Sequence, residues 1–427
     1  MALKDTLSSP LRAQISVWLI FLCFVLFPFK RSFELPILIM TISGMVLSYR
    51  LGKDLFRLPA TKAFTLLAAC IWIPMVLSLP DTYSFKDTGG AVLAFTRLYF
   101  SGLFVIWTLK DTERVTQMVK LMAWLTAFWV GDALFQAAVG HDVLGYAQIP
   151  SRLNGVFGER HWKLGVALPI LAPFLILSVR HKLSLMILAV LCTGAVVLMA
   201  GSRGGWLSYA VVCAVLIFTE VQNRRISLWK TAAFTALVVL LGAVLAFENA
   251  GTRARLDQSL MLFSGNEEKA DLATSGRLTL WKDAWAMIKA HPVNGVGVRA
   301  FSFAHPEFQP PGDLYIQNNH VDKETGRPTG AGYAHQLVLE VMSETGVIGL
   351  AGLGLFFFLL VRFWIQVSPE QKSLALPFAL AALAFLFPFN THSSFYSAQW
   401  AVMIWLVIAM LCAALALEER TQEGLSF

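Results

Sequence analysis

The stretch from Gly332 to Leu360, GYAHQLVLEVMSETGVIGLAGLGLFFFLL, places ionisable side chains directly before a long apolar run. If a helix begins near His335, then His335, Glu340 and Glu344 lie on one side of its first turns and apolar side chains lie on the other. Histidine changes its charge near neutral pH, which suits a general base, and either glutamate could orient it or raise its basicity. We therefore predict that this polar side faces a wet cavity. The alternative is an interfacial histidine bonded to loop backbone, with the glutamates balancing nearby arginines.

Arginines in unusual places form a second group of candidates. Arg203 stands in a glycine-rich turn, AGSRGGW, where the glycines let a ligand approach the backbone closely. Arg277 is expected in the first turn of a helix, where unpaired amides and the helix dipole favour an anion. The remaining members are Arg152, Arg160, His161 and Lys163, which share one loop, and Arg97, which lies inside an apolar span.

These basic residues predict a site for a phosphate-bearing ligand. The planar fork of arginine matches phosphate oxygens, so a lipid-linked phosphate or diphosphate is the expected ligand. An arginine inside a membrane span costs about 2.5–3.5 kcal/mol, so Arg97 needs a partner or a water-filled cavity. The alternative is that Arg203 pairs with Asp132 or with a glutamate and only holds helices together.

Patterns typical of a metal site are missing from the sequence. The five cysteines all lie inside apolar runs, with no CxxC pair, and the chain has no HExxH. We interpret Asp111 and Glu113, in the run Asp-Thr-Glu, as helix-start charges rather than a metal-binding pair. The expectation is chemistry without a metal or another cofactor, in which arginines take the place of the cation.

The elements that must hold these residues are membrane helices. Of 427 residues, 56% are apolar and 14% are charged, whereas about a quarter are charged in soluble domains. Apolar runs of membrane-spanning length recur, so we predict an all-α polytopic membrane protein. Glycines at 346, 349, 352 and 354 are interpreted only as places of close helix contact. Twelve spans are predicted: 15–29, 33–49, 63–80, 90–109, 116–139, 163–179, 183–200, 205–220, 229–248, 336–361, 373–389 and 395–417.

Lysine and arginine set the expected topology. With the N-terminus inside, the segments assigned to the cytoplasm carry seventeen of them and the short outer loops carry seven. Both termini are therefore predicted to be cytoplasmic, and the net charge of +7 is not interpreted as affinity for nucleic acid. The first apolar run is interpreted as an uncleaved span rather than a signal peptide.

Two outer segments exceed a plain turn, namely residues 140–162 and 250–334. The expected organisation is nine spans in residues 1–249, an outer loop in 250–334 and three spans in 335–427. Within the longer loop, Leu278, Trp281, Trp285 and Ile288 recur at helical spacing and predict an amphipathic helix. The alternative to a functional role is a helix that lies on the bilayer surface by its two tryptophans.

Four of these motifs, taken in order, resemble the O-antigen ligase and polymerase superfamily. They are RLNGVFGE from Arg152, GSRGG around Arg203, SGRLTLWKDAWAMIKAHPVNGVG around Arg277, and AHQLVLEVMSETGVIGL around His335. The resemblance implies a C-type (GT-C) glycosyltransferase fold and an inverting, metal-independent reaction at the periplasmic face of the bacterial inner membrane. The polysaccharide would pass from undecaprenyl diphosphate to the lipid A–core oligosaccharide, a step of lipopolysaccharide biosynthesis.

The resemblance also implies roles for individual residues. His335 would be the general base or would orient the acceptor hydroxyl. Arg203 and Arg277 would hold the diphosphate, with Arg152 and the Arg160–Lys163 cluster extending the anion site. The chain departs from the family pattern at Gln336, where many members have asparagine. It departs again at residues 159–162, Glu-Arg-His-Trp, where many have a run like Asn-Pro-Asn, and both departures leave the acceptor open.

Other functions stay possible from the sequence. A polymerase of O-antigen repeats or a protein O-oligosaccharyltransferase would use the same chemistry with another acceptor. A flippase for lipid-linked oligosaccharides would need basic residues along a path through the membrane, whereas here they crowd the outer face. A scaffold that only binds lipid-linked glycans would not need His335.

Overall fold

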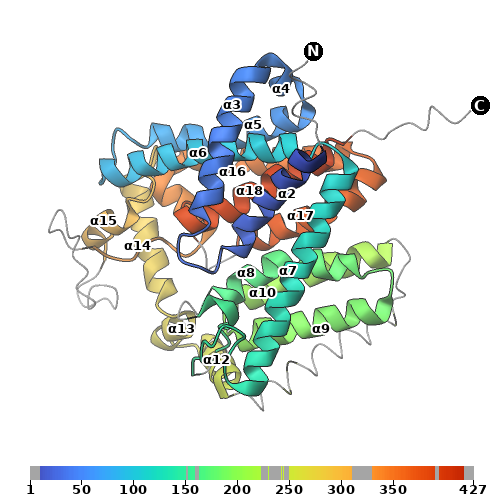
Figure 1. Cartoon of the computed structure of the whole chain (residues 1–427). Helices are drawn as coiled ribbons and strands as arrows, with labels where there is room; N and C mark the ends of the chain where they lie inside the picture. The colour runs from blue at the N-terminus through green and yellow to red at the C-terminus, as the bar shows by residue number, and fades with distance from the viewer. Residues whose placement is uncertain are drawn as a thin grey trace, which may run out of the picture.

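The computed structural model describes residues 10–150, 152–158, 163–222, 229, 242, 244, 250–309, 329–389 and 394–417. Within these ranges the fold is helical, and the only β contacts are two isolated bridges between residues 141 and 152. Figure 1 shows the long helices packed side by side, with the shorter helices of residues 250–307 at one end. The long helices are α2 (Pro10–Val25), α3 (Glu34–Leu51), α5 (Pro59–Leu77), α6 (Phe85–Thr108), α7 (Thr112–Val139), α8 (Leu164–Ser178), α9 (Leu183–Met199), α10 (Arg203–Gln222), α16 (Leu337–Gln366), α17 (Pro369–Leu386) and α18 (Ala398–Leu415).

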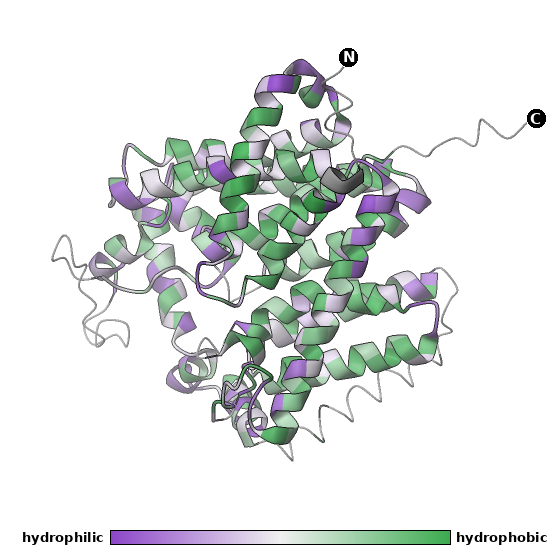
Figure 2. Cartoon of the chain, in the orientation of Figure 1, coloured by the Kyte–Doolittle hydropathy of each residue, from purple (hydrophilic) through white to green (hydrophobic). Residues whose placement is uncertain are grey.

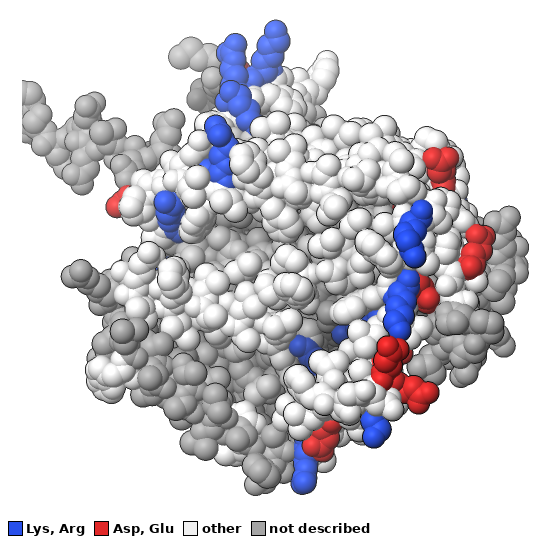
Figure 3. All heavy atoms as spheres, turned by 180° about the vertical axis from the view of Figure 1, so that it is seen from behind, with Lys and Arg blue, Asp and Glu red and all other residues white. Residues whose placement is uncertain are grey.

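A helix overlaps each predicted span except 229–248, which lies mostly outside the described residues. Seven described helices are long and apolar enough to cross a membrane by length and composition, namely α3, α5, α6, α7, α10, α16 and α18. Three shorter apolar helices, at Gln14–Val25, Leu164–Ser178 and Leu183–Met199, accompany them. Figure 3 shows a broad surface without charged side chains between two charged regions, as a lipid-facing belt requires. The chain is thus a multi-pass membrane protein, and the number of twelve spans stays a prediction.

The core is built around α18. Every residue of α18 from Trp400 to Leu415 is buried. Trp405 makes edge-on ring contacts with Phe64 of α5, Phe95 of α6 and Phe356 of α16. Edge-to-face pairs of this kind are favourable beyond the area that they bury. By contrast, α16 exposes most of its apolar window, as expected for a helix at the lipid-facing rim.

Helix starts follow from their capping residues. Asp111 accepts a hydrogen bond from the Arg114 amide at the start of α7, which confirms its interpretation as a helix-start charge. Ser84, Ser368 and Ser397 cap α6, α17 and α18 in the same way.

The glycine at 346 does more than allow helix contact. It has φ 64° and ψ −159°, a conformation that interrupts α16 and that side-chain-bearing residues rarely adopt. The segment 292–297 lies against this break, where Val296 N–H donates to Ser343 O (2.9 Å) and Val347 N–H donates to Pro292 O (2.8 Å). The expectation that Gly346 only permits close helix contact was therefore wrong, because the loop residues replace the backbone hydrogen bonds that the helix loses there.

The shorter helices form a small unit at one end of the bundle, which we call the loop end. They are α12 (Ala250–Leu260), η2 (Met261–Phe263), α13 (Glu267–Thr274), α14 (Arg277–Ala290), α15 (Phe301–Ala304) and η3 (His305–Glu307); α4 (Lys53–Arg57) and η1 (Gly155–Phe157) lie elsewhere in the chain. In Figure 2 this unit is rich in polar residues, whereas the bundle helices are mostly hydrophobic.

The helix predicted around Trp281 is confirmed as α14, but its buried face differs from the predicted stripe. The buried apolar residues are Leu280, Ala284, Met287 and Ile288, and the first three pack with Val296 and Phe301 in a second, smaller core. Trp285 is 51% exposed instead. The helix therefore has two apolar faces, one in the small core and one turned outward.

Candidate active site

Arg203 and Arg277 come together at the turn between α13 and α14. The Arg203 guanidinium donates to the Ala273 carbonyl and, at 2.6 Å, to Ser275 Oγ. Ser275 and Gly276 have φ 62° and 77°, so the chain reverses there and α14 begins at Arg277. Arg203, the first residue of α10, thus holds the turn from which α14 starts at Arg277. Two arginines that are distant in sequence therefore lie at the same turn of the loop end.

Arg152 and Arg255 join Arg203 in a cluster of three arginines. The Arg152 segment is held by Leu153 N–H, which donates to Met199 O at 3.0 Å, just before the glycine-rich turn. Arg255 of α12 lies against Gly201, where an added Cβ would be 2.6 Å from Arg255 Nε. Burial, together with the charges of Arg152 and Arg203, lowers the pKa of Arg255 to about 10. Burial also lowers the pKa of Arg152.

This arginine cluster lacks a counter-charge within the described part of the chain. No ion pair joins any of its three members to a described carboxylate, although other ion pairs occur in the structure. Like charges held close together at partly buried positions are unfavourable unless an opposite charge offsets them. A bound anion would supply that charge, and the guanidinium forks favour a phosphate or diphosphate.

Asp132 does not supply the missing charge. Its Oδ1 accepts a hydrogen bond from Val143 N–H at 2.9 Å, and a Cβ on Gly155 would be 2.9 Å from its Oδ2. Asp132 therefore holds the loop of residues 140–158 onto α7. The alternative in which Arg203 pairs with Asp132 is not the arrangement found in the structure.

His335 lies where α14 meets the start of α16. Trp281, one turn beyond Arg277 on α14, donates from Nε1 to Ala334 O at 3.0 Å. The His335 ring packs on Tyr333 with ring centroids 4.0 Å apart. His335 has φ 53°, an uncommon conformation for a residue with a side chain, and such strain clusters at functional sites. One helix therefore connects the Arg277 position with the segment that carries His335.

Gln336, where the family pattern often has asparagine, ends this segment and starts α16. Its Oε1 accepts a hydrogen bond from Leu339 N–H at 2.6 Å, which caps the helix. Its Nε2 donates to Pro388 O at 2.8 Å. The helix thus begins at Leu337 rather than at His335, and the longer amide ties its start to the end of α17.

A buried His–Asp pair supports the same segment from the other side. His305 Nε2 lies 3.2 Å from Asp283 Oδ2, and His305 Nδ1 accepts from Ala331 N–H at 3.3 Å. Both side chains are buried. The sequence analysis gave His305 no role, because its partners Asp283 and Ala331 come from other segments of the chain. Among the described residues no group of three or more His, Cys, Asp or Glu could hold a metal ion.

Glu340 and Glu344 are fully buried and hold loops onto α16. Glu340 accepts hydrogen bonds from Ser394 Oγ at 2.5 Å, from Phe395 N–H at 3.2 Å and from Tyr396 N–H at 3.3 Å. Glu344 Oε2 accepts from Arg299 N–H at 2.7 Å. Both lie on the predicted side of the helix, but in this structure they support the loops around the site instead of lining a place for substrate.

We expect Glu340→Ala to destabilise the protein without removing a reacting group. The change leaves the Ser394 hydroxyl and two amides without their buried acceptor, which costs roughly 3 kcal/mol. Thermal unfolding of the purified protein in detergent measures this loss. Glu340→Gln, which keeps one carbonyl oxygen as acceptor, should lose less, and an alanine variant as stable as the wild type would contradict the assigned role.

The other basic candidates lie in different surroundings. Arg97 of α6 forms an ion pair with Glu34 of α3, which gives this intramembrane arginine the partner that it needs. In this structure Arg97 therefore joins two helices outside the arginine cluster. Lys163 is 5% exposed and donates to Gln399 of α18. Arg160 and His161 lie outside the described residues.

Arg255 is the site residue that sequence reasoning missed. It stands in the run AGTRARL after the ninth predicted span, and no helix was predicted there. The sequence holds only a weak indication of Arg255, because Arg253 stands in the same run and is exposed in the structure. Only the fold of α12 onto the turn at Gly201 distinguishes the two.

Comparisons with known proteins show what the chain is similar to. Residues 188–354 match the family model described as O-antigen ligase. An uncharacterized protein of Haemophilus influenzae is 23% identical over 223 residues, which are 50% of this chain and 52% of that protein. The chain thus spans about half the length of this curated relative. The matched segment contains Arg203, Arg255, Arg277 and His335, whereas Arg152 precedes it. Over residues 188–354 the chain is thus similar to the O-antigen ligase family.

Proposed function

We propose that this protein is a membrane glycosyltransferase that moves a glycan from undecaprenyl diphosphate to the lipid A–core oligosaccharide. The observation that carries the proposal is the arginine cluster of Arg152, Arg203 and Arg255, which has no described carboxylate partner. It lies beside the turn that starts α14 at Arg277, and α14 leads to the His335 segment. An anion site that α14 connects to a histidine, with all of these residues except Arg152 inside the segment similar to O-antigen ligases, fits a reaction in which a diphosphate leaves.

In the proposed reaction the acceptor hydroxyl attacks the anomeric carbon from the face opposite the diphosphate. The new glycosidic C–O bond forms as the bond to the diphosphate oxygen breaks, so the anomeric configuration inverts. The arginines offset the charge that develops on the departing diphosphate. His335 orients the acceptor hydroxyl or takes its proton, and the fixed turns around it supply the positioning that such a reaction needs. We place this site at the periplasmic face of the inner membrane, with both termini cytoplasmic and a C-type glycosyltransferase fold.

The distribution of charge favours a transferase over a flippase. A flippase needs basic residues along a path through the membrane, but the arginine cluster gathers at the loop end of the described structure. The intramembrane arginine that was a candidate for such a path, Arg97, pairs with Glu34.

Transfer by the purified protein in detergent, with EDTA present, tests the proposal. The donor is an undecaprenyl-diphosphate glycan, and the acceptor is lipid A–core, a protein with hydroxyl side chains, or the donor itself. We expect product on the lipid A–core that does not depend on metal. Chain growth with donor alone would instead indicate a polymerase, and product on the protein acceptor an O-oligosaccharyltransferase. No transfer to any acceptor would overturn the proposal in favour of a flippase or scaffold.

A further inference from the structure

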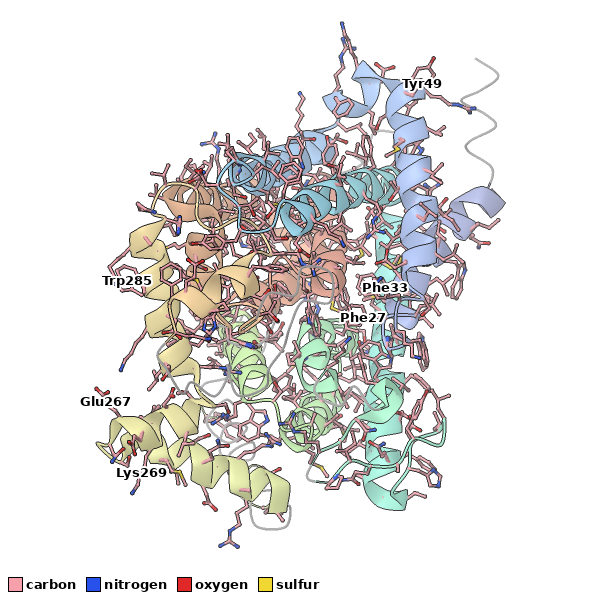
Figure 4. All side chains as sticks on the ribbon, turned by 90° about the vertical axis from the view of Figure 1, so that its left-hand side faces the viewer. Phe27, Phe33, Tyr49, Glu267, Lys269 and Trp285 are labelled. Carbon is pink, nitrogen blue, oxygen red and sulfur yellow. The ribbon has the colours of Figure 1, made fainter. Side chains whose placement is uncertain are left out.

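A cleft of about 620 Å³ opens between α13 and α14, on the outward apolar face of α14. Its volume falls within the range of roughly 300–1,000 Å³ that is usual for small-molecule sites. The wall from α14 contains Trp281 and Trp285, one turn apart, and the wall from α13 contains Glu267, Glu268 and Asp271. Figure 4 shows Trp285 and Glu267 projecting on the same side of the molecule.

We propose that this cleft binds uncharged sugar rings of a substrate, which deepens the proposed function and rests on it. Sugar rings present C–H faces that pack on aromatic rings and hydroxyl groups that donate to carboxylates. The cleft offers both partners, since two indoles line one wall and carboxylates line the other. Glu268 is exposed and forms no ion pair or hydrogen bond with a described residue, so its oxygens are available to hydroxyl donors.

The sign of the charge decides against other ligands. Three carboxylates and one lysine line the cleft, and Lys282 already lies 3.3 Å from Glu267. A phosphate or an anionic bilayer surface would meet net negative charge here, so neither suits this face of α14. The α13–α14 hairpin thus has two different surfaces. At the turn, Ser275 accepts a hydrogen bond from Arg203, and between the two helices lies the acidic, aromatic cleft.

The cleft also adjoins the proposed reaction centre. Trp281, which lines it, donates to Ala334 O, next to His335. Leu339, one turn beyond His335 in sequence, completes the inner wall. A saccharide in the cleft would therefore extend from the site where its terminal residue reacts. The same chemistry fits the glycan of the donor and the saccharide of the acceptor, and experiment must separate them.

Two variants test the cleft, each with a matched control. Trp285→Ala removes the exposed indole, and Phe263→Ala removes an aromatic ring that is 83% exposed at the loop end but outside the cleft. Glu268→Gln removes a cleft charge, and Asp257→Asn removes an exposed charge of α12 outside it. We expect each cleft variant to raise KM on the order of tenfold with little change in kcat, and each control to leave both unchanged.

The substrate whose KM rises shows whether the cleft binds the donor glycan or the acceptor saccharide. If the cleft variants raise the KM for the full donor but not for a donor that carries a single sugar, the donor glycan occupies the cleft. If the cleft variants raise the KM for lipid A–core but not for a truncated core, the acceptor saccharide occupies the cleft.

A binding measurement keeps this proposal separable from the transferase itself. Free repeat-unit oligosaccharide and free core oligosaccharide, both without lipid, are tested by saturation-transfer NMR against the wild type and Trp285→Ala. Saccharide binding that Trp285→Ala abolishes would support the cleft even if no transfer were found. Absence of binding to the wild type together with an unchanged KM in both cleft variants would overturn it. The proposal would also be overturned if Trp285→Ala changed only the association of the protein with phosphatidylglycerol vesicles and left saccharide binding and KM unchanged.

Discussion

Replacing Arg203 or Arg277 by alanine is expected to slow glycan transfer at least about 100-fold and up to about 1,000-fold, the cost of losing one contact to a developing anion. Arg203 belongs to the arginine cluster that has no described counter-charge, and its side chain fixes the turn at which Arg277 starts α14. The loss should appear in kcat as well as in kcat/KM, because the charge on the leaving diphosphate grows as the bond breaks. Single-turnover transfer with purified variants measures it.

Controls separate lost charge from lost structure. Arg203→Lys keeps a positive charge without the planar fork, so its rate should lie between those of the wild type and the alanine variant. Arg255→Ala should slow transfer, whereas Arg253→Ala, an exposed arginine on the same helix, should not. Unfolding temperatures in detergent check that each variant is folded. Transfer at close to the wild-type rate by Arg203→Ala or Arg277→Ala would refute the assignment of the arginines to the diphosphate.

The bundle was largely predictable because its signal is local. Most of the apolar runs are close to the length that spans a membrane, so length and composition place the described helices to within a few residues. Arg203 and Arg277 could be singled out in the same way. A glycine-rich turn and a helix start are features of a few neighbouring residues, and each explains why an anion would be favoured there.

The remainder depended on segments that the sequence does not bring together. Whether Arg97 pairs within the membrane or faces a ligand depends on Glu34, 63 residues earlier. Glu340 lies on the predicted side of its helix, but that side meets the chain at Ser394–Tyr396 rather than water. Gly346 could be recognised as a small residue. Its role at a helix break required the loop of residues 292–297 to supply the missing hydrogen-bond partners.

His335→Ala is expected to lower the transfer rate by about 10²-fold if the histidine orients the acceptor hydroxyl, and by up to about 10⁴-fold if it is the general base. His335 has φ 53°, so substitution also changes the cost of an uncommon backbone conformation. His335→Asn is therefore the better-matched variant, because asparagine tolerates this conformation and still forms hydrogen bonds but cannot take up a proton near neutral pH.

The asparagine variant distinguishes the two roles that His335 could have. If His335 is the general base, His335→Asn should be as slow as His335→Ala. The wild-type rate should then fall as the pH drops and the base becomes protonated, and this fall should vanish in the variant. If His335 only orients the acceptor hydroxyl, the asparagine variant should retain much of the activity with the same pH profile as the wild type. Because the diphosphate is already a good leaving group, positioning matters more than proton transfer, and we expect the second result. An alanine variant that transfers glycan at the wild-type rate would remove His335 from the site altogether.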